Sequence, residues 1–360
     1  MKSSALSFCL LLAALLVPCS GSGKNLRLGA IADFRLVKSS LNGGRSRFGT
    51  NEDKHFDLGR LALSASGAVR EGVKFYSHLD FQSTVNGGAN LTVNEAYMKF
   101  NPFVGRLSGK FGAYALPFSI AYGEPMRTTT WTITPSALDT FFEGLRITGF
   151  EVSKGYDVPG HHFNWAFGTG YGNDGASLFN RQFNFSEAPG NVNGLEGDGH
   201  LAAYGYIGKF RSNACKRGRL SWHTGFFWNG GDGDNSLRAA DETKFLLFDC
   251  QFWKPYWGIA IQGMLGSSRR ADVLQEADVS YVMAWGRINR KVSGILRYDH
   301  WNLATEAGTT VDRGHGLTVA LSRQISKEQL LQVEWLKPSV SVGLGPKTSV
   351  QWQIRYRLHF

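Results

Sequence analysis

The chain ends on residues 350–360, VQWQIRYRLHF, in which two kinds of side chain alternate strictly. The apolar or aromatic set is Trp352, Ile354, Tyr356, Leu358 and Phe360, and the polar set is Gln351, Gln353, Arg355, Arg357 and His359. Successive side chains of a β-strand point to opposite faces of the sheet. This period of two therefore predicts a strand with one apolar face and one charged face.

The same period of two recurs along most of the chain from residue 26 onward. Segments of eight to twelve residues alternate in this way and are separated by Gly, Asn, Asp or Pro, which interrupt strands. We count sixteen such segments. A soluble β-sandwich would turn the charged face outward and a membrane barrel would turn it into the lumen, so periodicity alone does not choose between these folds.

The connections between the segments favour the barrel. Long polar loops, such as 115–140 and 172–200, alternate with tight turns, such as Ser66-Gly67-Ala68 and Lys254-Pro255. Bacterial outer-membrane barrels have an even number of strands, with long loops on one rim and short turns on the other. The sequence therefore predicts an all-β fold, a transmembrane antiparallel β-barrel of about 16 strands.

Most of the tryptophans lie near the ends of the predicted strands. Outer-membrane barrels carry amphipathic rings as two girdles at the headgroup level, facing lipid. We assign to such girdles Trp222, Trp228, Trp253, Trp257, Trp285, Trp301, Trp335 and Trp352. The alternative is that these residues are ordinary aromatics of a sheet core.

Residues 1–23 have the pattern of a cleavable secretory signal peptide. Lys2 precedes an apolar run at 10–17, and small residues follow at 20–23. The run is too short for a membrane-spanning helix, which needs about 20 residues, and Pro18 argues against a lipid anchor on Cys19. We therefore expect export through the signal peptide and one barrel domain, residues 24–360, in the outer membrane.

The net charge of +10 is basic, and the bases are distributed singly along the chain. Neither a basic helix nor a cluster of bases and aromatics indicates nucleic-acid binding. A basic balance then favours anionic solutes or an anionic surface. After removal of the signal peptide two cysteines remain, Cys215 and Cys250, and we expect both as free thiols because Cys250 falls on the apolar face of a predicted strand.

Three segments resemble the phosphate-selective porin O and P family of Gram-negative outer membranes. They are HFDLGRLAL at 55–63, VNEAYMKF at 93–100 and GKFGAYALPF at 109–118. The resemblance implies a trimer of sixteen-stranded barrels in which the loop after the fifth strand, here 115–140, folds inward as a constriction. The alternating C-terminal segment also looks like the signal that the barrel-assembly machinery recognises, carried by Trp352, Ile354, Tyr356, Leu358 and Phe360.

Charged side chains around the narrow part of a pore set its ion preference. Extending the strand phase predicts a lumen in which bases outnumber acids, and arginine's planar fork suits oxyanions such as phosphate. The predicted pore-lining bases of the anion pathway are Arg60, Lys74, Lys99, Arg106, Lys110, Arg127, Arg146, Arg355 and Arg357. The alternative is that these bases pair with lumen acids or bind lipopolysaccharide phosphates. The loop itself offers one base, Arg127, against Glu124 and Asp139.

The predicted function is a passive porin for small hydrophilic solutes, with an anion preference and without a cofactor or metal. The expected partners are small anionic solutes, outer-membrane lipid and lipopolysaccharide, the barrel-assembly machinery and two further copies of the chain in a homotrimer, but not nucleic acid. The rival hypotheses are a lipase-like barrel enzyme and an adhesin or structural barrel. The chain lacks the Gly-x-Ser-x-Gly motif of many hydrolases and any Cys/His spacing typical of zinc sites, so we expect no enzyme activity.

Overall fold

The computed structural model describes most of the chain beyond the N-terminal segment. The described residues are 26–39, 54–83, 89–103, 107–116, 132, 136, 138, 146–159, 161–172, 201–210, 218–230, 242–270, 273–305, 310–341, 346–348 and 350–359. The predicted signal peptide lies outside them. No helix in this part of the chain is both long and apolar enough to cross a membrane.

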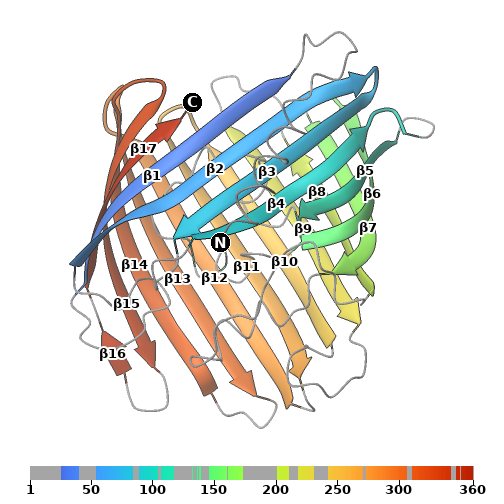
Figure 1. Cartoon of the computed structure of the whole chain (residues 1–360). Helices are drawn as coiled ribbons and strands as arrows, with labels where there is room; N and C mark the ends of the chain where they lie inside the picture. The colour runs from blue at the N-terminus through green and yellow to red at the C-terminus, as the bar shows by residue number, and fades with distance from the viewer. Residues whose placement is uncertain are drawn as a thin grey trace, which may run out of the picture.

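The described residues form one antiparallel sheet whose strands follow one another in chain order. Its strands are β1 (Arg27–Ser39), β2 (Lys54–Arg70), β3 (Val73–Ser83), β4 (Ala89–Phe100), β5 (Ser108–Ala115), β6 (Arg146–Val158), β7 (His161–Gly172), β8 (Leu201–Phe210), β9 (Arg219–Gly230), β10 (Glu242–Trp253), β11 (Trp257–Arg270), β12 (Val273–Arg287), β13 (Val292–Thr305), β14 (Thr310–Gln324), β15 (Gln329–Ser341), β16 (Pro346–Thr348) and β17 (Gln351–His359). β1 pairs with β2 on one side and with β17 on the other, which closes the sheet into a barrel (Figure 1).

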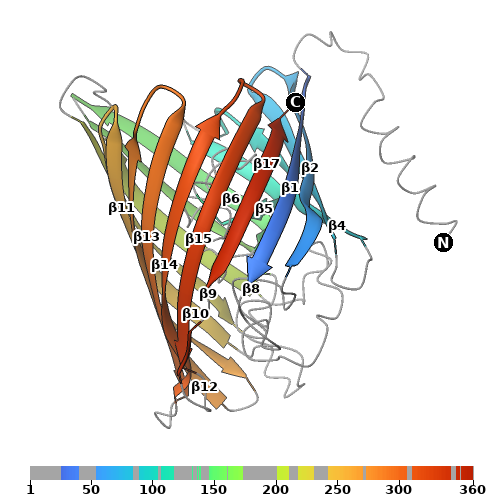
Figure 2. The same cartoon turned by 90° about the vertical axis from the view of Figure 1, so that its left-hand side faces the viewer.

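The barrel wall has sixteen strands, because β16 and β17 are two parts of one strand. Both pair with β15, and a single register relates Ser339 to Thr348 and Leu336 to Gln351 across the short break at 349–350. The predicted strand number is therefore confirmed for the described part of the chain. Figure 2 shows β17 lying beside β1, with the strands inclined to the barrel axis as closure requires.

One predicted turn is wrong. The segment Ser66-Gly67-Ala68 belongs to β2, where Gly67 pairs with Phe75 of β3. The chain turns instead at 71–72, where Gly72 has φ +72° and a Cβ would lie 2.8 Å from the carbonyl oxygen of Asn101. A single glycine between small residues fits a strand as well as a turn, whereas a positive φ favours glycine. The predicted turn at Lys254-Pro255 is confirmed between β10 and β11.

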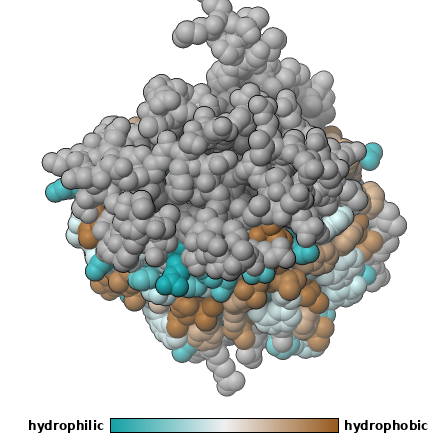
Figure 3. All heavy atoms as spheres, turned by 90° about the horizontal axis from the view of Figure 1, so that it is seen from below, coloured by the Kyte–Doolittle hydropathy of each residue, from teal (hydrophilic) through white to brown (hydrophobic). Residues whose placement is uncertain are grey.

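The two faces of the wall differ as a membrane barrel requires. Large apolar side chains are exposed on the outer face, for example Phe111 at 60% and Leu246 at 63%, and Figure 3 shows hydrophobic residues, interspersed with more polar ones, on the part of the wall that is coloured in that view. Ionised side chains such as Asp33, Arg297 and Glu334 are buried on the inner face. An apolar outer face and a charged inner face would be unfavourable for a protein surrounded by water, whereas they are favourable for a barrel with lipid outside and a polar lumen inside.

The tryptophans are divided between the two faces. Trp228, Trp257 and Trp352 are exposed outward, as predicted for girdle residues. Trp301 is completely buried on the inner face, in phase with the buried Arg297, so its assignment to a girdle is wrong. The girdle assignments of Trp253 and Trp285 are wrong for the same reason, because both side chains face inward. Trp253 is hydrogen-bonded to inward-facing Gln251, and Trp285 is in phase with buried Tyr281 and Met283. Proximity to a strand end does not determine which face a side chain takes.

The closed sheet leads to a first prediction for the folded protein. In the part of the chain that the structure describes, each of the sixteen strands is hydrogen-bonded to a neighbour on either side, so detergent finds no free edge from which to separate the sheet. We expect the unheated protein to migrate in SDS gels as a compact band distinct from the boiled protein. Identical migration of boiled and unheated samples prepared from membranes would contradict a stable closed barrel.

Candidate functional site

Three predicted lysines lie side by side on the inner face of β3, β4 and β5. Lys74 is the register partner of Lys99, and Lys99 is the register partner of Lys110. The side chains of Lys74 and Lys99 are exposed, and that of Lys110 is 17% exposed. Residues directly opposite on neighbouring antiparallel strands have Cβ atoms about 5 Å apart, where like charges repel. We refer to Lys74, Lys99 and Lys110 as the lysine row.

The third member of the lysine row has a counter-charge. Lys110 Nζ lies 3.2 Å from a carboxylate oxygen of Glu151 on β6, and it also lies over the rings of Tyr97 and Tyr114. Glu151 is buried and also accepts a hydrogen bond from the Tyr204 hydroxyl. Most of the uncompensated positive charge of the lysine row is therefore at Lys74 and Lys99.

Two other predicted bases, Arg355 and Arg357 of β17, are buried on the inner face. Arg357 donates to both carboxylate oxygens of Asp33 on β1, over 2.5 Å from Nε and 2.6 Å from Nη2. Arg355 Nη1 lies 3.7 Å from the same carboxylate, and its Nη2 donates to Gln332 of β15. The two arginines thus join the first and last strands of the barrel.

Residues from the connection between β5 and β6 also lie inside the barrel. Arg297 of β13 donates from Nη1 to the Thr132 hydroxyl, while its Nε donates to Asp299 over 2.8 Å. Arg355 Nη2 lies 3.4 Å from the carbonyl oxygen of Thr132. Leu138 is completely buried in the apolar cluster of the inner wall. Two described residues of this connection therefore contact the inner wall, Thr132 through polar contacts and Leu138 through apolar ones.

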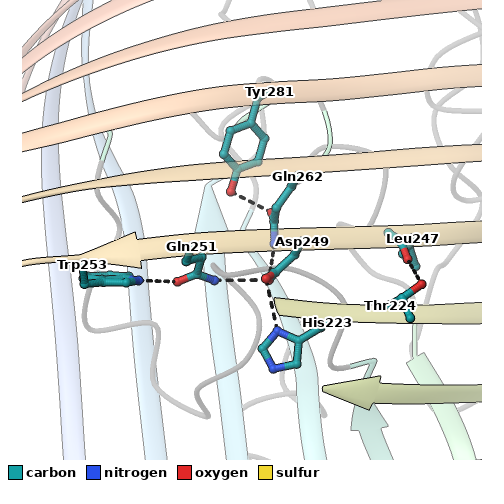
Figure 4. Close-up of polar contacts among 8 residues, drawn as sticks. All are labelled: His223, Thr224, Leu247, Asp249, Gln251, Trp253, Gln262 and Tyr281. Atoms are coloured by element: carbon teal, nitrogen blue, oxygen red, sulfur yellow. Dashed lines mark hydrogen bonds and ion pairs between the residues drawn. The ribbon is translucent and has the colours of Figure 1, made fainter. Parts of the chain in front are cut away.

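A hydrogen-bonded ladder crosses the inner face of β9–β12 (Figure 4). Asp249 of β10 accepts from Gln251 Nε2 over 3.2 Å and from Gln262 Nε2 over 3.0 Å, and its other carboxylate oxygen lies 3.1 Å from Nδ1 of His223. The hydroxyl of Tyr281 donates to Gln262 over 2.7 Å. Sequence reasoning missed this ladder, although placing Cys250 on the apolar face already implied that its neighbour Asp249 faces inward.

The remaining predicted site residues are placed less fully. The register sets Arg60 opposite Asp33, and it sets position 146 opposite Ala115, on the other face from buried Ile147. The side chains of Arg60 and Arg146 are not among those described, and Arg106, Arg127 and Phe360 lie outside the described residues. Of the C-terminal segment, Trp352 and Ile354 are exposed on the outer face.

The described side chains offer little for metal or thiol chemistry. Within the described ranges, His, Cys, Asp and Glu do not form any group of three or more that could hold a metal ion. Cys250 is a free thiol, exposed on the outer face of β10 as predicted, and Cys215 lies outside the described residues. The chemistry that the inner face does offer is ionic and hydrogen-bonding.

Comparison with solved structures shows the fold. The anion-selective porin from Comamonas acidovorans aligns with a TM-score of 0.61 and 12% identity, over 93% of this chain and 99% of that one. The outer-membrane channel DcaP of Acinetobacter baumannii gives 0.59 and 13%, over 93% and 97%. The trimer form of OmpT, an outer membrane protein of Vibrio cholerae, gives 0.56 and 10%, over 93% and 99%. No family model and no curated protein matches the sequence. The chain therefore has the fold of outer-membrane porins at very low sequence identity.

Proposed function

We propose that this protein is an outer-membrane porin, a passive water-filled channel for small hydrophilic solutes with a preference for anions. The observation that carries the proposal is the closed barrel itself, apolar on the outside and lined with ionised side chains within. Such a wall replaces lipid by water and fixed charge along the path of an ion. The barrels that align over nearly the whole chain include one that is named an anion-selective porin.

The anion preference rests on which inner-face charges meet water. Among the described side chains, the inward acids Asp33, Glu151, Asp299 and Glu334 are buried, and the partly exposed Asp249 accepts hydrogen bonds from Gln251 and Gln262. Lys74 and Lys99 are exposed. A mobile ion therefore meets the ammonium groups of the lysine row, whereas Asp33 and Asp299 are paired with arginines and Glu151 with Lys110 and Tyr204. Phosphate and related oxyanions remain the solutes that we favour within this class.

The connection at 115–140 supplies the constriction in this proposal. Its Thr132 contacts two arginines of the inner wall, which places this residue of the connection inside the lumen. Arg127 precedes Thr132 by five positions and would bring a further positive charge toward the pore axis. Assembly as a homotrimer agrees with the trimer form of the Vibrio cholerae protein. Export by a cleaved signal peptide, recognition of the C-terminal segment by the assembly machinery and contact with lipopolysaccharide complete the proposal.

Recording from the refolded protein in planar bilayers tests both parts of the proposal. We expect stepwise ohmic conductance and, across a potassium chloride gradient, a zero-current potential of the sign set by chloride. A cation-selective channel would contradict the anion preference. A protein that inserts without conducting would contradict the porin assignment and favour an adhesin or structural barrel, and a lipase assay on the same preparation tests the enzyme alternative.

A further inference from the structure

Two tryptophans meet on the inner face close to the rim that carries the turn between β10 and β11. Trp253 ends β10 and Trp285 lies near the end of β12, with ring centroids 5.5 Å apart and ring planes at 54°. The strand between them contributes Gly258, the register partner of both. A Cβ at Gly258 would lie 2.4 Å from Nε1 of Trp285. The missing side chain allows the two indoles to approach each other over β11.

The position of these indoles distinguishes them from other tryptophans of the barrel. Girdle residues face lipid, as Trp257 does, whereas Trp253 and Trp285 face the lumen. Neither is buried as completely as Trp301: both are partly exposed, although Trp285 also packs against the apolar cluster of the inner wall. Aromatic surface facing an aqueous lumen is a surface on which an apolar part of a solute can lie.

Hydrogen-bonding groups continue from the indoles along the inner face, away from the turn between β10 and β11. The Trp253 Nε1 donates to Gln251 over 3.0 Å, and Gln251 in turn donates to Asp249 (Figure 4). His223, with its side chain 25% exposed, stands beside Asp249. Arg219, the register partner of Trp253, is exposed next to the indole pair. An apolar platform thus borders planar amide, carboxylate, imidazole and guanidinium groups.

We propose that this wall is a binding subsite for a sugar ring. A pyranose has an apolar C–H face that can cover an indole, and its hydroxyls both donate and accept around the edge of the ring. Trp253 and Trp285 provide the platform, while Gln251, His223 and Arg219 provide hydrogen-bonding groups at its edge. Binding sites with a few convergent polar groups on an aromatic lining have this composition. The inference rests on the proposed channel function and adds a solute class that the lysine row would not select.

The test is inhibition of the potassium chloride current by glucose and maltose, with polyethylene glycol of matched size as a steric reference. We expect the sugars to reduce the current with saturation and the polymer to reduce it without saturation. Trp253→Ala should raise the half-saturating sugar concentration about tenfold, which corresponds to about 1.4 kcal/mol of binding free energy. The conductance without sugar should be retained.

The control is Trp257→Leu, which removes an indole from the outer face of the same hairpin. We expect this variant to bind sugar as the wild type does. Absence of saturable inhibition in a conducting wild type, or equal inhibition of Trp253→Ala and wild type, would overturn the sugar subsite and leave the porin assignment intact. A wild type without conductance would overturn the porin assignment, and the subsite with it.

Discussion

Replacing Lys74 and Lys99 together by glutamate is expected to invert the ion preference of the channel. The two ammonium groups are exposed neighbours on the inner wall, and the substitutions convert two positive charges into two negative ones. Two unit charges 4 Å apart interact by about 1 kcal/mol in water and several-fold more where the wall excludes solvent. A shift of roughly tenfold or more in the chloride-to-potassium permeability ratio follows. The zero-current potential across a potassium chloride gradient measures it.

The control for this charge reversal is Lys337→Glu. Lys337 is exposed on β15 with its side chain in phase with the outward-facing Val333, so the same chemical change occurs on the outer face. Its zero-current potential should equal that of the wild type. The effect of the inner pair should also weaken in concentrated salt, because the screening length falls from about 10 Å at 0.1 M to about 3 Å at 1 M. An unchanged potential in the double variant would remove the lysine row from the ion path.

The third lysine is expected to behave differently. Lys110 is already compensated by Glu151, so Lys110→Glu changes the field less per charge and places two carboxylates side by side at a buried position. Such a variant combines a selectivity change with a loss of stability. This difference could not be predicted from the sequence, because all three lysines share one phase and one residue type.

Much of the barrel could be predicted from the sequence because lipid requires an apolar outer face, so that apolar and polar residues alternate along each strand. The alternation in residues 350–360 is present in β17, with Gln351, Gln353, Arg355 and Arg357 buried inward and Trp352 and Ile354 exposed outward. Where both phases of a strand carry charge, this alternation gives no answer. In β6 the basic position 146 and the acidic Glu151 have opposite phases, and the structure places Glu151 inward.

The state of each lumen charge could not be predicted at all, because it depends on contacts between distant segments. Arg355 and Lys99 both face inward. Arg355 is buried, with its Nη2 3.4 Å from the carbonyl oxygen of Thr132 and its Nη1 3.7 Å from the carboxylate of Asp33, whereas Lys99 remains exposed. Asp33 and Arg357 are 324 positions apart and meet only because the barrel closes. Strand phase gives the face of a residue, and closure of the barrel determines what shares that face with it.

The seam between β1 and β17 gives the largest expected effect on stability. Asp33 is the counter-charge of Arg357 and lies 3.7 Å from Arg355, and all three side chains are buried. Asp33→Asn leaves two guanidinium groups inside the wall without that carboxylate. Removing one partner of a buried ion pair costs about 3–5 kcal/mol, because the remaining charge stays desolvated. We expect a corresponding fall in the free energy of unfolding, measured by urea titration of the folded barrel in detergent micelles.

The matched control is Asp157→Asn, which removes a carboxylate paired with His162 over 2.7 Å at an exposed site on the rim. Exposed ion pairs contribute little, so its unfolding midpoint should stay at the wild-type value. Combining Asp33→Asn with Arg357→Met should recover part of the lost stability, since an apolar side chain in the wall avoids the desolvated charge. Equal midpoints for Asp33→Asn and wild type would show that the barrel closes through its backbone hydrogen bonds alone. Recovery in the double variant would instead show that the uncompensated guanidinium, rather than the lost hydrogen bonds, weakens the seam.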